Sequence, residues 1–181
     1  IIAINLDDGD ELHWVAQTDG DREVILSTAD GQALRFSETE VRAMGRSARG
    51  VKGMRLREGD RIVGMDIVVE GSTIVVVSEN GYGKKTKVDQ FTAHKRGGVG
   101  IKTAIINAKT GKIVDVKSVV DPASELMMIS EAAQVIRLGL KDVPSLGRTT
   151  QGVRVMRLSE GDKVAGFEVV QESAEQVEEA Q

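Results

Sequence analysis

Positively charged side chains recur in this sequence at a fixed distance from glycine. Gly50–Lys52, Gly100–Lys102 and Gly152–Arg154 each place a Lys or Arg two residues after an anchor glycine. Lys and Arg neutralise phosphates without reading bases when no recognition helix accompanies them. Nearby glycines also let backbone N–H groups approach a phosphate closely. The spacing therefore predicts a polyanion contact in each copy of a repeated unit.

Further cations occupy two other kinds of position, the strand that follows a tight turn and the long loop after it. The strand positions are Arg35, Lys84, Lys85 and Arg137. The loop positions are Arg46, Arg49, Lys95, Arg96 and Arg148. An alternative is that these charges keep a β-rich surface soluble and blunt its edges. Because they recur at matched positions, we favour phosphate contact for all twelve.

Other reactive groups are sparse. His13 and His94 have no serine or cysteine motif near them, and cysteine is absent from the chain. Tyr82 lies between two glycines, which is typical of a structural aromatic beside a turn. The Gly-Asp pairs at residues 9–10, 59–60 and 161–162 lack the ligand density of a calcium loop and are predicted to bond local backbone. We expect no catalytic centre, metal site or cofactor in this chain.

The elements that must position the cations come from an internal repeat. Residues 45–63 (GRSARGVKGMRLREGDRIV) match residues 147–165 (GRTTQGVRVMRLSEGDKVA), and residues 95–114 form a diverged copy between them. Successive anchor glycines are 50 and 52 residues apart, and residues 4–12 begin the chain with a truncated copy. Periods of this size indicate one supersecondary unit repeated about an axis. We expect a partial unit at 1–20, full units at 21–70, 71–121 and 122–170, and an acidic tail at 171–181.

Each full unit shows four strand-like segments. The first two strands flank Asp30-Gly31 or Asn80-Gly81, which are strong hairpin signals, whereas Ala132-Ala133 is a weaker one. The expected strands are Glu23–Ser27, Gln32–Phe36, Gly50–Leu56 and Arg61–Val69; then Thr73–Ser78, Tyr82–Val88, Gly100–Ile106 and Lys112–Val120; then Leu126–Ser130, Gln134–Leu138, Gly152–Leu158 and Lys163–Val170.

The character of these strands predicts an all-β, propeller-like array of four-stranded blades. Runs such as Ile74–Val77 and Leu126–Ile129 are apolar on both faces, as expected for sheets sandwiched between neighbours. Helical periodicity is nearly absent, and the best candidates are Glu38–Met44 and the tail after Gln171.

Charge is unevenly distributed along the chain. The net charge is −4, yet all 24 Lys and Arg lie within residues 21–170, together with 19 of the 28 acids. A basic body between acidic ends suggests a polyanion-binding surface, with the alternative of an ordinary solvated surface. The absence of cysteine and of any long apolar run favours an intracellular protein, and we expect a cytoplasmic location without a membrane.

The motifs resemble a known family. GRSARGVKGMRL with EGDRIV, NGYGKKT at residues 80–86, and GRTTQGVRVMRL with EGDKV are similar to the C-terminal domain of bacterial DNA gyrase A. The resemblance covers residues 1–170 and implies a β-pinwheel, whose blades exchange a strand and whose basic outer edge bends DNA. It implies DNA contact by the candidate cations other than Arg35.

The resemblance also implies a role within a larger enzyme. In that family the domain wraps DNA and gives an ATP-dependent type II topoisomerase its bias toward negative supercoiling. The partners implied are double-stranded DNA, the rest of gyrase A, and gyrase B, in a heterotetramer with two copies of each protein. ATP and magnesium are expected to act in other domains.

One motif departs from the family. Its gyrase A box, Gln-basic-basic-Gly-Gly-basic-Gly, is matched only partly by KRGGVG at residues 95–100, so we expect the complete box before Ile1. The alternatives are the corresponding domain of topoisomerase IV, which bends DNA differently, and a propeller that binds a protein partner. The tail glutamates, Glu172–Glu179, are expected to compete with DNA for the basic edge.

Overall fold

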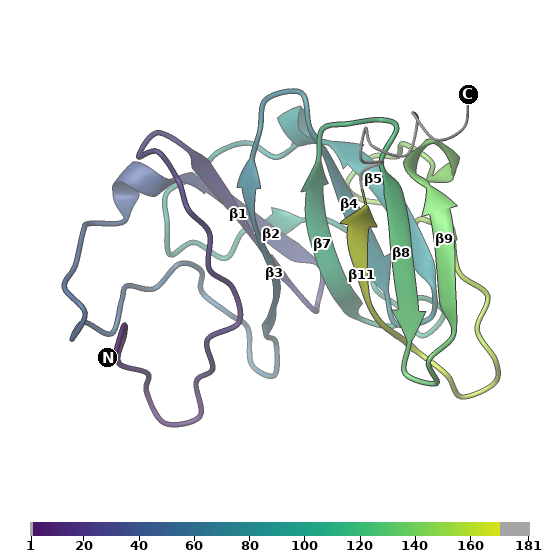
Figure 1. Cartoon of the computed structure of the whole chain (residues 1–181), viewed down its shortest axis with the longest axis horizontal. Helices are drawn as coiled ribbons and strands as arrows, with labels where there is room; N and C mark the ends of the chain where they lie inside the picture. The colour runs from purple at the N-terminus through teal and green to yellow at the C-terminus, as the bar shows by residue number, and fades with distance from the viewer. Residues whose placement is uncertain (1, 171–181) are drawn as a thin grey trace, which may run out of the picture.

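The computed structural model describes residues 2–170, which form three antiparallel sheets that follow one another along the molecule (Figure 1). The first sheet has the order β3-β1-β2-β6. Its strands are β1 (Glu23–Thr28), β2 (Gln32–Ser37), β3 (Ile62–Val68) and β6 (Ile101–Lys102). The predicted acidic tail lies outside the described residues.

The second sheet repeats this plan, and the third repeats it without a fourth strand among residues 2–170. The second has the order β10-β5-β4-β7 and the third β11-β8-β9. The strands of the second are β4 (Thr73–Ser78), β5 (Tyr82–Lys87), β7 (Ile113–Val119) and β10 (Val153–Arg154). Those of the third are β8 (Glu125–Ser130), β9 (Val135–Gly139) and β11 (Val164–Val170).

A strand is exchanged between neighbouring units. β6 comes from the unit after β1, β2 and β3, yet it completes their sheet by pairing with β2 at Gln32–Lys102. In the same way β10 pairs with β5, with Arg154 opposite Tyr82. The predicted all-β, strand-exchanged array is therefore confirmed, with four strands in each of the first two sheets and three in the third among the described residues.

The third strand of each unit is shorter than its sequence predicts. The expected strands Gly100–Ile106 and Gly152–Leu158 shrink to two residues each, and residues 50–56 form no strand. Gly100 has φ +80°, and a Cβ there would lie 2.5 Å from the carbonyl oxygen of Ala33. The chain thus crosses the neighbouring hairpin at a sharply turned glycine, and only a short stretch after it can pair.

The hairpin turns explain why the first two strands are regular. Gly31 and Gly81 adopt φ +78° and +74°, as the Asp-Gly and Asn-Gly signals predict. Ala133, at φ 63°, is the one non-glycine with positive φ among the described residues, so the third hairpin forms despite the weaker signal.

Core packing follows the predicted two-sided apolar pattern in the second sheet. Residues Ile74–Val77 of β4 are at most 3 % exposed because the first and third sheets cover its two faces. In the third sheet the expectation is wrong for one face. Met127 and Ile129 of β8 are 42 % and 44 % exposed, since no sheet in the described part of the chain covers them.

Short 3-10 helices follow the second strands. The predicted helix Glu38–Met44 is only Glu38–Glu40, with Ser37 as its cap, because the following residues turn away as an extended loop. Equivalent 3-10 helices, Val88–Gln90 and Leu140–Asp142, were not predicted. No helix in residues 2–170 is long and apolar enough to span a membrane.

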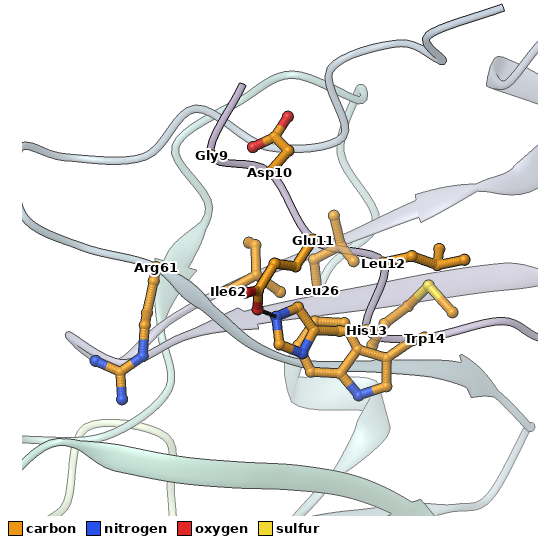
Figure 2. Close-up of a pocket in the computed structure, with 10 residues that line it drawn as sticks. Gly9, Asp10, Glu11, Leu12, His13, Trp14, Leu26, Arg61 and Ile62 are labelled. Atoms are coloured by element: carbon orange, nitrogen blue, oxygen red, sulfur yellow. Dashed lines mark ion pairs between the residues drawn. The ribbon is translucent and has the colours of Figure 1, made fainter. Parts of the chain in front are cut away.

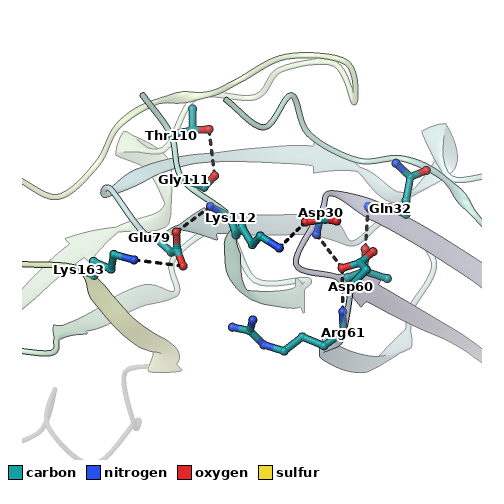
Figure 3. A network of polar contacts seen from close by, with 10 residues as sticks. Asp30, Gln32, Asp60, Arg61, Glu79, Thr110, Gly111, Lys112 and Lys163 are labelled. Carbon is teal, nitrogen blue, oxygen red and sulfur yellow. Dashed lines mark hydrogen bonds and ion pairs between the residues drawn. The ribbon is translucent and has the colours of Figure 1, made fainter. Parts of the chain in front are cut away.

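Polar contacts tie each unit to the one before it (Figure 3). The ammonium of Lys112 lies 2.9 Å from Asp30 in the first hairpin turn, and that of Lys163 lies 3.6 Å from Glu79 in the second. Asp60 accepts from the backbone N–H of Asp30 at 3.0 Å as well as from its own neighbour. The Asp60 carboxylate therefore bonds local backbone, as predicted, and also bonds a hairpin turn 30 residues away, which was not predicted.

Candidate nucleic-acid interface

The exchanged strands form the outer edge of the array. β3 and β7 lie at the opposite edges of their sheets and pack together, since a Cβ on Gly64 would be 3.0 Å from the carbonyl oxygen of Val116. β6 and β10 are thereby directed away from the packed inner strands. Lys102 and Arg154 lie in these two strands, and Lys52 occupies the equivalent position in the repeat, although residues 50–56 pair with no sheet in the described part of the chain.

Three equivalent cations are exposed there. Lys52, Lys102 and Arg154 all present accessible side chains. Within residues 2–170, the side chains of Lys52 and Lys102 have no hydrogen-bond acceptor or ion-pair partner. Within the same residues, the guanidinium of Arg154 makes one side-chain hydrogen bond, which it donates to the hydroxyl of Tyr82 at 3.4 Å. These three side chains can each reach an external anion without first breaking a salt bridge.

Four other candidates are also on the surface. Arg46 and Lys95 are exposed in the loops before the outer strands. Arg49 is ion-paired with Asp7 at 2.6 Å, and Arg137 is ion-paired with Glu125. Exposed pairs of this kind contribute little stability, about 0–1 kcal/mol, so a phosphate can compete with the carboxylate.

Arg35 and Lys85 instead tie successive units together. The guanidinium of Arg35 pairs with Glu23 and donates to the carbonyl of Val88 at 3.1 Å. At the equivalent position, the ammonium of Lys85 donates to the carbonyl of Leu140 at 2.7 Å. Each cation therefore binds the 3-10 helix of the following unit, and its charge is directed inward.

Arg96 and Arg148 make a second kind of tie. The guanidinium of Arg96 donates to the carbonyl of Lys52, and that of Arg148 donates to the carbonyl of Lys102 at 2.8 Å. Each arginine thus fixes the backbone beneath an exposed outer-edge lysine of the preceding unit. Both side chains are half-buried, which limits how far they can move toward a ligand.

Lys84 is buried, although the sequence predicts it as a contact residue. It is 1 % exposed, and its ammonium donates to the carbonyls of Gly147 and Arg148 at 2.7 Å each. Burial, with a smaller contribution from the Arg148 charge, lowers the pKa of Lys84 from 10.5 to about 8. Lys84 cannot contact an external phosphate in this conformation.

Sequence reasoning also missed exposed cations near the outer edge. Arg55 and Arg157 occupy equivalent places in the repeated Met-Arg-Leu motif, which was the available signal. Lys109 lies 5.4 Å from the ring centre of Tyr82, and Arg154 lies 5.7 Å from the same centre. Nothing in the repeat points to Lys109, because it falls in the diverged copy.

A pocket of about 460 Å³ lies where the N-terminal segment crosses the first sheet (Figure 2). His13 lies 3.2 Å from Glu11 and stacks near Trp14, with ring centres 5.1 Å apart. Among the described residues, no serine, cysteine or threonine lines this pocket, so the histidine has no nucleophile to activate. Within residues 2–170 no cluster of three or more potential metal ligands occurs.

Comparison with protein families gives a direct match. The model described as DNA gyrase C-terminal domain, beta-propeller, matches residues 1–19, 22–68, 72–119 and 124–171. The chain belongs to the DNA gyrase C-terminal domain family. The four matched ranges together cover most of the chain.

Relatives agree with this assignment. The DNA gyrase A protein of Aminobacterium colombiense is 45 % identical over 167 residues, which is 92 % of this chain and 20 % of that protein. The DNA gyrase A protein of Staphylococcus epidermidis is 43 % identical over 173 residues, or 94 % and 19 % of the two chains. The chain thus spans about a fifth of the length of these relatives.

Solved structures show the same fold. A crystal structure of the C-terminal domain of DNA topoisomerase IV superposes with a TM-score of 0.88 at 30 % identity, covering 93 % of this chain and 53 % of that one. A DNA gyrase A C-terminal domain superposes with a TM-score of 0.83 at 29 % identity, covering 94 % and 58 %. The chain therefore has the fold of the C-terminal domains of DNA topoisomerase IV and DNA gyrase A.

Proposed function

We propose that this chain binds double-stranded DNA without sequence preference and bends it around the outer edge. The observation that carries the proposal is the recurrence of Lys52, Lys102 and Arg154 as exposed cations on the outer edge of successive units. Arg46, Lys95, Arg49 and Arg137 extend this surface, and Arg96 and Arg148 support it from below.

The energetics favour a wrap over a single contact. Smoothly bending a short duplex by tens of degrees costs about 1–6 kcal/mol. Several phosphate contacts offset this cost only if they lie on a rigid, continuous edge. The inter-unit contacts of Arg35, Lys85 and Lys112 supply that rigidity, because each joins two units directly.

A wrap of fixed hand gives the domain its role in a larger enzyme. DNA that leaves the outer edge with one crossing sign biases strand passage toward negative supercoiling. We place the chain within an ATP-dependent gyrase in the cytoplasm, assembled with the rest of gyrase A and with gyrase B. The catalytic chemistry, ATP and magnesium belong to other parts of that assembly.

Binding is tested by titrating a duplex of about 150 base pairs over a salt series, since each phosphate neutralised contributes about −0.9 to the slope of log affinity against log salt. Lys102→Gln should weaken binding to unrelated sequences equally and reduce the slope by about 0.9. Lys163→Gln is the control, because it removes the same charge away from the outer edge. Lys163 directly precedes the inner strand β11 and pairs with Glu79. A slope near zero for the native chain would refute DNA binding and favour a protein partner.

Bending alone, as expected for a topoisomerase IV domain, is the second candidate because of the TM-score of 0.88. The two are separated by relaxing closed circular DNA in the presence of the chain and measuring the linking number after the protein is removed. A wrap of fixed hand leaves a linking-number change of one sign. Binding without such a change would support the second candidate.

A further inference from the structure

We propose that Lys84 is a positioning residue, whose protonated amine holds the outer-edge cations Lys102 and Arg154 in the arrangement that DNA requires. The proposal rests on the proposed DNA binding and assigns to it a proton-sensitive support beneath the surface. Lys84 itself contacts no DNA.

The hydrogen bonds of the Lys84 ammonium are all with one loop of the following unit. From β5 its ammonium donates to the carbonyls of Gly147 and Arg148 at 2.7 Å each and to the hydroxyl of Thr150 at 3.1 Å. An ammonium has three N–H donors, so every donor is matched by one acceptor. The protonated side chain is thus fully satisfied although it is buried.

That loop joins the two outer strands. The guanidinium of Arg148 donates to the carbonyl of Lys102 in β6, and the carbonyl of Thr150 accepts from the N–H of Ile105 at 3.0 Å. Two residues further on, Gly152 leads into β10 and Arg154. A displacement of residues 147–150 would therefore move both exposed cations at once.

The fold itself does not require a lysine at this place. The equivalent residues are Leu34 in the first sheet and Ile136 in the third. Leu34 is 1 % exposed. The loop that corresponds to residues 147–150 contains Gly98, and it is held to the preceding unit by the backbone N–H of Arg55, which donates to the carbonyl of Gly98 at 2.8 Å. The second sheet therefore has a charged lysine at a position where the first and third sheets have an aliphatic side chain.

The surroundings of Lys84 do not compensate its charge. On β4 it faces Val76, and its remaining neighbours, Ser78, Tyr82, Ala104–Ile106, Thr110, Ile113 and Gln151, line a cavity of only about 10 Å³. The hydroxyl of Tyr82 is engaged by Arg154. Among the described residues, the charged group that influences the pKa of Lys84 is Arg148, whose positive charge disfavours a protonated neighbour.

Loss of the proton has a defined structural effect. Burial first, and Arg148 second, lower the pKa of Lys84 to about 8. A neutral amine has two N–H donors for the three acceptors, and its lone pair faces one of them. The hold of Lys84 on residues 147–150 therefore weakens as the pH rises through about 8.

The test compares the native chain with Lys84→Leu, which copies the residue found at the same place in the first sheet. Duplex affinity is measured from pH 6.5 to pH 9 at constant salt. Native affinity should fall across this range by about fivefold to tenfold, the equivalent of one lost hydrogen bond of ordinary net strength. The Lys84→Leu variant should remain near the native value at pH 9 throughout.

Two controls make the outcome decisive. Lys102→Gln removes a surface contact, so its affinity should be lower than native but should show the same pH profile. Lys84→Leu leaves the carbonyls of Gly147 and Arg148 without their ammonium donor, so its melting temperature should fall modestly. A general structural role would lower affinity by the same factor at every pH, whereas loss of the pH dependence in a variant that is still folded at the assay temperature indicates positioning.

The proposal is overturned if Lys84→Leu binds like the native chain, or if it keeps the native pH profile at lower affinity. Failure of the native chain to bind DNA would instead refute the proposed function. A second measurement needs no variant. Amide protection factors of residues 149–154 should fall above pH 8, whereas those of the equivalent residues 97–102, which lie above Leu34, should not.

Discussion

Substituting the anchor glycines with alanine tests the strand exchange on which the outer edge depends. Gly50, Gly100 and Gly152 are equivalent in the repeat and adopt φ of +83°, +80° and +79°. An added Cβ on Gly152 would lie 2.6 Å from the carbonyl oxygen of Gly83 in β5, whereas one on Gly50 would meet no atom within 4 Å. Alanine would therefore introduce similar backbone strain at both positions, but it would introduce a steric clash only at residue 152.

The expected magnitudes follow from this difference. An L-residue at positive φ costs about 1–2 kcal/mol, and forcing a methyl group into a packed contact costs about 1–3 kcal/mol more. Gly152→Ala should therefore destabilise the chain by about 2–5 kcal/mol and Gly50→Ala by about 1–2 kcal/mol. The clash also pushes β10 off β5, so the exposed guanidinium of Arg154 leaves its place.

Urea unfolding followed by circular dichroism measures both variants. The midpoint should fall much further for Gly152→Ala than for Gly50→Ala, with an unchanged m-value, since m reports the surface exposed on unfolding. DNA affinity in native buffer should fall for Gly152→Ala alone. Equal loss of stability in the two variants would show that close approach of the exchanged strand to the hairpin contributes nothing, and would refute the reasoning.

Three further outcomes follow from individual contacts. Burial raises the pKa of Asp115 to about 6, so the folded chain loses stability as the pH rises from about 4 to 6. Asp115→Asn should remove that pH dependence and raise the free energy of unfolding at pH 7 by about 1–3 kcal/mol. Urea midpoints measured across this pH range check both expectations. Lys112→Gln should cost about 0.2–1 kcal/mol, and less in high salt, because its pair with Asp30 is partly exposed; a cost unaffected by salt would contradict this. Arg96→Lys should cost about 1–2 kcal/mol, since an ammonium cannot replace the guanidinium donors, whereas Lys52→Gln should leave stability within about 0.5 kcal/mol and lower only DNA affinity.

Much of the fold could be predicted from the repeat. Asp30-Gly31 and Asn80-Gly81 locate the hairpins because only residues that tolerate positive φ can make such turns. Recurrence at intervals of 50 and 52 residues indicates equivalent units, and the two-sided apolar run of β4 indicates a sheet with neighbours on both faces. These features are local, so the sequence alone contains them.

The length of the third strands and of the helix after β2 could not be predicted. Glu38–Met44 has helix-compatible residues, yet only one 3-10 turn forms, since the next segment must cross to the following unit. Residues 100–106 and 152–158 resemble strands, but pairing continues only while the chain stays beside the neighbouring hairpin. Both limits are imposed by contacts with another unit.

The sequence by itself determined that cations recur with the repeat, and hence that some of them lie on a common edge. Only the tertiary structure decided which of them face solvent. Lys52 and Lys102 differ from Arg96 and Arg148 because the latter find backbone carbonyls 44 and 46 residues away. Lys84 occupies the place of Leu34 and is satisfied by a loop 63 residues further on. Charge and spacing are properties of the chain, whereas the acceptor that turns a side chain inward is supplied by a neighbouring unit.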